Sequence, residues 1–189
     1  MEASDGDLVN AARGGDREAM QQLVERYQRR VLAVVLGMVG NPEDAREIVQ
    51  DAFIRAFRGL DRFKGDSSFY TWIYRIAVNL AIDSQRRDSR RPTVEYDEAL
   101  PPGEDPIGSG GVEMGRDPFR SVRNRELGRR IFEAIDGLTP NHRAVILLRE
   151  VEGLSYEEIA STLEISLGTV MSRLHYARKK LQARLEELL

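Results

Sequence analysis

The clearest structural motif of the chain lies at residues 154–188, LSYEEIASTLEISLGTVMSRLHYARKKLQARLEEL. Ser155 and Glu158 form an S-x-x-E capping box, which predicts the start of a helix of about eight residues. The small Ala160 lies in the middle of that helix, and the apolar Val170 follows ten residues later, in a second helix beyond a tight turn. This spacing is typical of a helix-turn-helix, in which a small residue lets two helices approach closely.

The second of these helices is expected to expose short polar and basic side chains. With Val170 on the buried face, 100° per residue places Ser172, His175, Tyr176 and Lys179 outward. Such a face can read base edges and hold phosphates, although a solvated basic helix is the alternative. Glycine often occupies the preceding turn, whereas this chain has Glu164 near it. The candidate residues are Ser155, Thr169, Met171, Ser172, Arg173, His175, Tyr176, Arg178 and Lys179.

Helical apolar spacing continues towards the N-terminus. Asp16 can cap a helix that Gly40 ends, and Asn41 followed by Pro42 can start the next. A third apolar stripe follows the break at residues 62–68, and no convincing alternating strand pattern competes. We therefore predict an all-α fold.

Residues 92–122 separate the two helical regions. They contain five of the seven prolines, five glycines, and 7 Asp and Glu against 2 Lys and Arg. Residues 1–91 and 123–189 each carry one net positive charge. A flexible coil of this length spans about 30 Å and reaches at most about 100 Å. We expect two small helical domains, 1–91 and 123–189, joined by an acidic flexible linker at 92–122.

A second basic surface is predicted on the third helix. A row of residues at i, i+4, i+7 and i+11, which includes two arginines and an asparagine, lies beside the apolar stripe, and aromatic residues in the same helix suit the binding of unpaired bases. Trp72 lies on the apolar stripe, which favours a core role. Asn79 can read a base or cap a buried carbonyl, and the sequence leaves both open. The row is Arg75, Asn79, Ile82 and Arg86, and it continues into Arg87, Arg90 and Arg91.

The second helix of the N-terminal region carries an acidic row, Asp44, Glu47, Gln50 and Asp51. Such a row is usually a solvated face, and it can also dock a basic partner. The residues by themselves do not choose between the two.

Composition excludes several classes of function. The chain has no cysteine, two histidines and a net charge of −3, which exclude disulfides and make a zinc hydrolase improbable. Its longest apolar run, Val31–Leu36, is far shorter than the roughly 20 residues of a membrane span. We find no Gly-rich phosphate loop, metal cluster or Ser-His-Asp set, and His142 is interpreted as a surface residue. We expect a cytoplasmic protein without direct membrane insertion, which is not an enzyme and needs no cofactor.

Two runs resemble a known family. EIVQDAFIRAFRGLDRFKGDSSFYTWIYRIAVNLAIDSQRR (Glu47–Arg87) and LREVEGLSYEEIASTLEISLGTVMSRLHYARKKL (Leu148–Leu181) are similar to the conserved domains of bacterial RNA polymerase sigma factors of the extracytoplasmic function type, in the sigma-70 family. The resemblance implies a sigma2-like bundle at 1–91 and a sigma4-like helix-turn-helix domain at 123–189. It also implies a subunit that binds core RNA polymerase and initiates transcription of a stress- or signal-responsive regulon.

The resemblance assigns partners to the predicted surfaces. The helix-turn-helix would read duplex DNA at the minus-35 element, and the N-terminal domain would capture the melted non-template strand at the minus-10 element. The acidic row would dock on the clamp helices of the beta-prime subunit, the beta flap would be a further contact, and an anti-sigma factor would restrain the chain. The implied minus-10 residues are Phe63, Lys64, Gly65, Asp66, Ser67, Ser68, Phe69, Tyr70, Trp72, Tyr74, Arg75, Asn79, Arg86 and Arg87.

Two residues depart from the family pattern. Met171 stands where family members often carry Arg or Lys, and Tyr176 stands where Arg is common, so we predict a minus-35 preference different from the common AAC-containing type. Two other interpretations stay open, a dimeric helix-turn-helix regulator that binds operators without polymerase, and an inhibitor that mimics a sigma domain.

Overall fold

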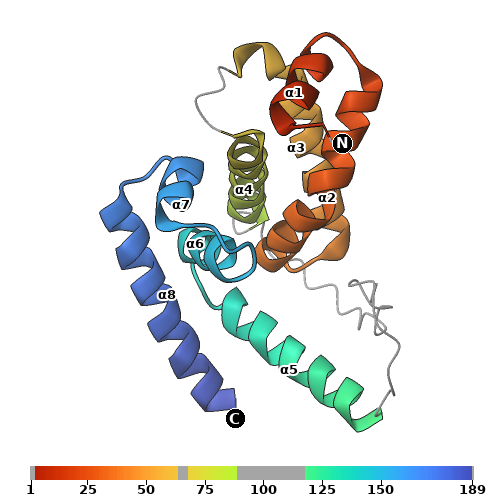
Figure 1. Cartoon of the computed structure of the whole chain (residues 1–189). Helices are drawn as coiled ribbons and strands as arrows, with labels where there is room; N and C mark the ends of the chain where they lie inside the picture. The colour runs from red at the N-terminus through yellow and green to blue at the C-terminus, as the bar shows by residue number, and fades with distance from the viewer. Residues whose placement is uncertain (1–2, 64–67, 89–117, 189) are drawn as a thin grey trace.

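The computed structural model describes residues 3–63, 68–88 and 118–188, and every regular element in these ranges is helical. The N-terminal unit consists of α1 (Asp5–Arg13), α2 (Arg17–Val39), α3 (Pro42–Arg58), the short 3₁₀ helix η1 (Leu60–Arg62) and α4 (Phe69–Asp88). The C-terminal unit consists of α5 (Pro118–Asp136), α6 (Pro140–Glu150), α7 (Tyr156–Leu163) and α8 (Leu167–Leu188) (Figure 1). The predicted all-α class is confirmed.

Local capping signals set several helix ends. The Asp16 carboxylate accepts hydrogen bonds from the backbone N–H groups of Glu18 and Ala19 and starts α2. Gly40 ends α2 in the left-handed conformation, at φ +78°. Asn41 caps α3, with Pro42 in its first turn. These ends lie where the sequence predicts them.

The helix α1 was missed by the sequence analysis, although a signal for it exists. Ser4 and Asp7 form a capping box, in which the backbone N–H of Asp7 donates to Ser4 Oγ at 3.2 Å. Arg13, at the other end, donates to the main-chain oxygens of Leu60 at 3.2 Å and Phe63 at 2.7 Å. The helix therefore fastens η1 and the start of the following loop. Its buried residues are Leu8, Val9 and Ala12.

The predicted linker lies largely outside the described residues. Residues 92–117 are not described, and α5 begins at Pro118, inside the predicted linker segment. Proline suits the first turn of a helix because its missing N–H would have no partner there.

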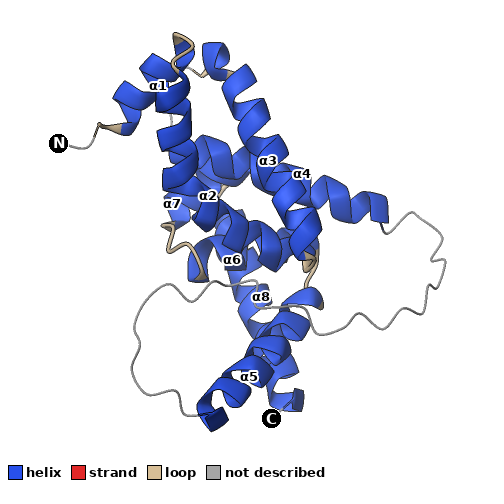
Figure 2. Ribbon diagram, turned by 90° about the vertical axis from the view of Figure 1, so that its right-hand side faces the viewer, coloured by secondary structure: helices blue, strands red, loops and turns tan. Residues whose placement is uncertain are grey.

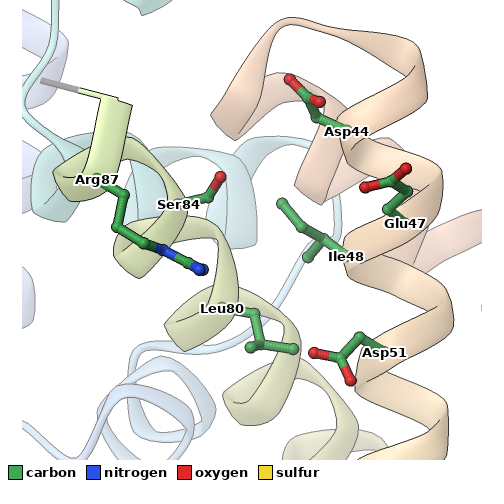
Figure 3. Close-up of a pocket in the computed structure, with 7 residues that line it drawn as sticks. All are labelled: Asp44, Glu47, Ile48, Asp51, Leu80, Ser84 and Arg87. Carbon is green, nitrogen blue, oxygen red and sulfur yellow. The ribbon is translucent and has the colours of Figure 1, made fainter. Parts of the chain in front are cut away.

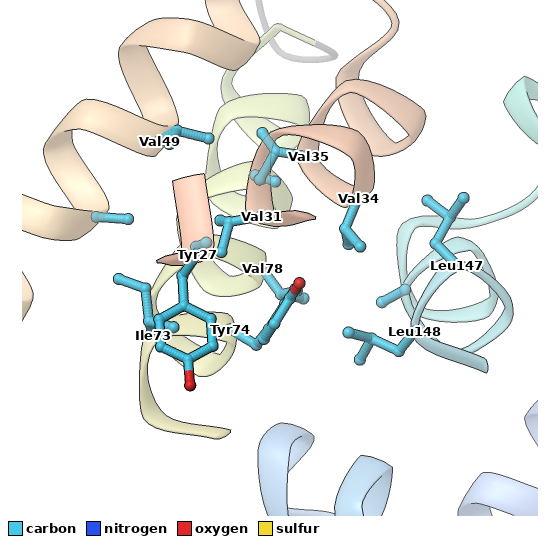
Figure 4. Packing of buried hydrophobic residues seen from close by; sticks show 14 of the residues in the cluster. Tyr27, Val31, Val34, Val35, Val49, Ile73, Tyr74, Val78, Leu147 and Leu148 are labelled. Carbon is cyan, nitrogen blue, oxygen red and sulfur yellow. The ribbon is translucent and has the colours of Figure 1, made fainter. Parts of the chain in front are cut away.

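The two units pack against each other through a continuous core. α2 contacts α6, and α4 contacts both α6 and α7. Val34 of α2 faces Leu147 and Leu148 of α6 (Figure 4). Gly37 allows a close approach of α2 and α6, because a Cβ there would lie 2.7 Å from Leu147 Cδ2. α5 and α8 project away from the N-terminal unit (Figures 1 and 2).

No helix within the described ranges is both long enough and apolar enough to cross a membrane.

Candidate nucleic-acid and polymerase interfaces

The helix-turn-helix forms as predicted. Ser155 Oγ accepts from the backbone N–H of Glu158 at 3.1 Å, and Glu158 accepts in return from the backbone N–H of Ser155 at 2.7 Å. Glu164 occupies the turn in the left-handed conformation, at φ 53°. The N–H of Ile165 then donates to the oxygen of Ala160 at 3.1 Å and closes the end of α7. A glutamate thus adopts the backbone that glycine usually supplies.

The helix α8 presents the expected face to solvent. Val170, Leu174 and Ala177 are buried against α6 and α7. On the outward side, Met171 is 49% and Tyr176 is 63% exposed. Ser172, His175 and Lys179 are also exposed, and Thr169 and Arg173 are half-buried.

Tyr176 belongs to an aromatic group that includes a residue of α6. Its ring centroid lies 6.2 Å from that of His142 and 5.9 Å from that of His175. The imidazole Nδ1 of His142 shares a hydrogen bond of 2.7 Å with Thr139 Oγ1. Partial burial lowers the pKa of His142, and the positive charges of Arg173 and Lys180 lower it further. His142 is therefore a member of the candidate DNA-binding face, which the sequence analysis did not recognise.

Arg178 is ion-paired across to α6. Its Nη2 lies 2.7 Å from Glu150 Oε1 of α6, and this hydrogen bond raises its pKa. Both residues line a groove between α5, α6 and α8, whose remaining walls are mainly apolar: Ile131, Ala134, Ile135, Ile146, Leu147, Val151, Leu181 and Leu185.

On α4, most aromatic candidates pack inward. Phe69 and Tyr74 are buried. The half-buried Trp72 stacks on Phe63, with ring centroids 4.9 Å apart. This packing favours the core interpretation of Trp72. Tyr74 is covered by the C-terminal unit. The prediction that it belongs to a surface for a single DNA strand therefore does not describe this conformation.

The polar candidates of α4 have mixed surroundings. Arg75 donates to Glu164 Oε1 at 2.8 Å and to the oxygen of Ser161 at 2.9 Å, both in the C-terminal unit. Asn79 is exposed, as are Arg86 and Arg87, and Tyr70 is half-buried. Ser68 Oγ accepts from the backbone N–H of Thr71 at 3.1 Å, in the first turn of the helix. The candidates Lys64, Gly65, Asp66 and Ser67 lie outside the described residues.

The acidic row of α3 is divided between two grooves. Asp44, Glu47 and Asp51 line a groove between α3 and α4 and face Arg87 (Figure 3). Gln50 lies on the other flank of α3, in a groove between α2 and α3, because it is turned by about 100° from this face. The second groove has apolar walls from Val24, Leu32, Val49, Phe53, Ile54 and Phe57, and its polar residues are Gln28, Arg46 and Gln50. The four residues therefore do not form one surface.

Among the described residues, no three or more His, Asp and Glu side chains are grouped so that they could hold a metal ion.

Comparison with known proteins agrees with this architecture. Residues 23–91 match Sigma-70 region 2, and residues 128–181 match Sigma-70, region 4. The ECF RNA polymerase sigma-E factor of Escherichia coli (strain K12) is 39% identical over 186 residues, which cover 98% of this chain and 96% of that protein. The RNA polymerase sigma-H factor of Pseudomonas aeruginosa is 36% identical over 98% of this chain and 95% of its own length.

Solved structures also resemble the chain. CnrH, in complex with the cytosolic domain of CnrY, matches with a TM-score of 0.70 and 26% identity, over 97% of both chains. The sigma factor RpoE of Bartonella quintana, in complex with the anti-sigma factor NepR, shares the fold with a TM-score of 0.63 and 22% identity, over 88% of this chain and 96% of its own. With a region 2 bundle, a region 4 helix-turn-helix and full-length relatives, the chain belongs to the sigma-70 family of RNA polymerase sigma factors, in its extracytoplasmic function group.

Proposed function

We propose that this chain is a dissociable subunit of RNA polymerase that directs the core enzyme to promoters in the cytoplasm and has no catalytic step of its own. The observation that carries the proposal is the presence in one chain of two exposed faces whose chemistry suits nucleic acid. One is the exposed face of α8, the second helix of the helix-turn-helix, and the other is the basic end of α4.

The face of α8 suits the major groove of duplex DNA at a minus-35 element. Ser172 and His175 are short polar side chains that can contact base edges, whereas the longer Lys179 suits phosphate. Tyr176 and Met171 offer aromatic and apolar contacts where relatives often carry a cation. The preferred sequence at this element therefore differs from the AAC-containing type.

The α4 surface suits a single strand at a minus-10 element. Asn79 is exposed and can reach a base edge, and Arg86 and Arg87 lie further along the same helix, where they suit successive phosphates. Base flipping costs a few kcal/mol, which contacts to the flipped base must offset. Arg75 would add a further phosphate contact once it leaves Glu164.

The α3 helix suits the docking of core polymerase. Asp44 and Glu47 are exposed carboxylates that complement a basic partner such as the clamp helices of the beta-prime subunit. Gln50 would contact the partner from the apolar groove between α2 and α3. The apolar groove between α5, α6 and α8 suits a helix of the beta flap. An anti-sigma factor would restrain the chain by covering these grooves.

Run-off transcription tests the proposal. Core polymerase is incubated with fragmented host DNA, with and without the chain, and the transcripts are sequenced. New start sites that share two upstream elements support a sigma factor, and Asn79→Ala should weaken the preference at the minus-10 element alone. Binding of duplex fragments without polymerase, and no new starts, would instead support a dimeric operator-binding regulator.

A further inference from the structure

The helix α1 is tied to residues 59–63, the segment that contains η1. Arg13, the last residue of α1, donates through Nε to the main-chain oxygen of Leu60 at 3.2 Å and through Nη2 to that of Phe63 at 2.7 Å. At the other end of α1, Asp5 pairs with Arg26 of α2 at 2.5 Å. A guanidinium donates from a rigid planar fork, so the two bonds from Arg13 fix both the place and the direction of the segment.

The segment held by Arg13 supports the indole of Trp72. The Phe63 ring stacks on this indole, with an angle of 30° between the ring planes. A Cβ at Gly59 would lie 3.3 Å from Trp72 Cζ2, so the backbone of the segment also packs on the indole, and Phe69 lies edge-on to it. Both Phe63 and Trp72 are half-buried. Because Trp72 is packed on several sides, Phe63 is the member of the pair that can offer its ring to a ligand.

The aromatic pair lies at one end of the proposed minus-10 surface. Trp72 and Asn79 are seven residues apart in α4. This spacing places them about 20° apart around the helix and about 10 Å apart along it. Arg86 continues the same line after another seven residues. Aromatic, amide and guanidinium groups thus follow one another along one face of α4, and this combination suits a single strand, whose bases stack and whose phosphates need neutralisation.

We propose that Arg13 is a positioning residue for promoter recognition, which holds the Phe63 ring on Trp72 so that this ring stacks on an unpaired base. That base is the neighbour of the one that Asn79 reads. The inference rests on the proposed function, because it assigns the α4 face to the minus-10 strand. Arg13 itself contacts no base and acts through Phe63. Its loss weakens the binding of the unpaired strand, whereas α8 still binds duplex DNA and α3 still binds polymerase.

Tryptophan fluorescence of the free chain tests the contact itself. Trp72 is the only tryptophan in the sequence, so its emission reports the aromatic pair. Arg13→Ala should shift the emission to longer wavelength and increase its quenching by acrylamide, because the indole becomes more exposed. Arg13→Lys should show a smaller change, since an ammonium group lacks the fork that spans two oxygens. Arg17→Ala is the matched control, because it removes an exposed arginine at the start of α2, and its emission should equal that of the wild type.

A fluorescent base tests the effect on DNA. The promoter found by run-off transcription is prepared with 2-aminopurine, which is quenched when it stacks, at the position next to the base read by Asn79. Polymerase with the wild type or with Arg17→Ala should quench this base, and polymerase with Arg13→Ala should quench it less. Arg13→Ala should also need about tenfold more promoter for half-maximal transcription, the loss expected when hydrogen bonds from a charged donor are removed. Its minus-35 preference in a random promoter library should stay that of the wild type.

A double-mutant cycle tests whether Arg13 acts through Phe63. Phe63→Ala removes the ring that Arg13 positions, so adding Arg13→Ala to it should cause little further loss of transcription. Circular dichroism and thermal unfolding check that each variant keeps its helices. If Arg13→Ala unfolds at the assay temperature, Arg13→Lys replaces it in every comparison, with an intermediate loss expected.

The outcomes separate this proposal from the proposed function. Equal losses for Arg13→Ala and Arg17→Ala would reflect a general attraction of positive charge to DNA and would overturn the positioning role. Losses that add in the double variant would overturn it too, because Arg13 would then act without Phe63. If the wild type transcribes and Arg13→Ala quenches 2-aminopurine equally well, only the positioning role fails. If the emission of Trp72 changes as expected but no form of the chain supports transcription, the proposed function fails, and the positioning role fails with it.

Discussion

The guanidinium of Arg143 in α6 donates through Nη1 to the main-chain oxygen of Met38 in α2, at 2.5 Å. Its Nη2 donates to the oxygens of Asp136, at 2.5 Å, and Leu138, at 3.2 Å, near the end of α5. Helix C-termini carry partial negative charge and carbonyls without helical partners, which favours a cation there. A single buried side chain thus joins the ends of two helices from different units.

Replacing Arg143 should therefore destabilise the whole chain. Arg143→Met keeps much of the apolar stem but removes every donor, and we expect the free energy of unfolding to fall by about 3 kcal/mol. Arg143→Lys should recover only part of this, since an ammonium group cannot fork between two helix ends. Urea denaturation followed by circular dichroism measures both.

Arg129→Ala is the control for this series, because Arg129 is an exposed residue of α5 with an i,i+4 pair to Glu133. Such surface pairs contribute little, and its unfolding midpoint should stay near that of the wild type. A loss below about 1 kcal/mol for Arg143→Met would show that the Met38 contact is dispensable.

The protein should become more stable when glycine replaces Glu164, the residue in the turn of the helix-turn-helix. Glu164 adopts φ 53°, which costs about 1–2 kcal/mol for a residue with a Cβ. Its ion pair with Arg75 is largely exposed on the glutamate side and offsets little of that cost. We expect Glu164→Gly to raise the free energy of unfolding by about 0.5–1 kcal/mol, after the larger entropy of glycine in the unfolded chain is subtracted.

Glu164→Ala is the matched variant, because it removes the same ion pair and keeps the unfavourable backbone. It should be no more stable than the wild type in thermal unfolding. If Glu164→Gly and Glu164→Ala lose stability equally, the contact with Arg75 outweighs the backbone conformation.

The helices could be predicted where their signals are local. The caps at Asp16, Asn41 and Ser155 each act within three residues, so a short window of sequence contains both donor and acceptor. The helical spacing of the apolar residues then identified the buried face of α8, around Val170. The Ser4 cap of α1 was equally local and was overlooked.

The contacts between the N-terminal and C-terminal units could not be predicted in this way. Tyr74 and Glu152 lie 78 residues apart, and a helical period indicates that Tyr74 has buried neighbours without indicating which helix supplies them. Arg75 matched a basic row, and nothing in that row pointed to Glu164. The sequence analysis therefore assigned both α4 residues to DNA, whereas the structure gives both a partner inside the chain.

Mild acid should weaken the fold through His142. Its pKa in the folded chain lies below the ordinary value of 6.5, so the unfolded chain takes up this proton at a higher pH than the folded chain does. The contribution of His142 to the free energy of unfolding should therefore be constant above about pH 7.5 and fall as the pH drops through 6.5 towards the folded pKa. His142→Gln removes this titration, and its stability should change less between pH 7.5 and 5.5. The prediction would be contradicted if the free energy of unfolding changed equally with pH for the wild type and for His142→Gln in that window.

Two substitutions on the exposed face of α8 should distinguish residues that read bases from residues that bind phosphate. Met171 is half-exposed there, and Met171→Arg would introduce a fork that can bind guanine through two hydrogen bonds. Polymerase carrying this variant should select a guanine at one minus-35 position from a random promoter library, with a gain of about 1–3 kcal/mol over the other bases. Lys179→Gln should instead weaken all promoters alike and lower the salt dependence by about one phosphate contact. If Met171→Arg strengthened every sequence equally, its side chain would contact the DNA backbone, and position 171 could not set the minus-35 preference.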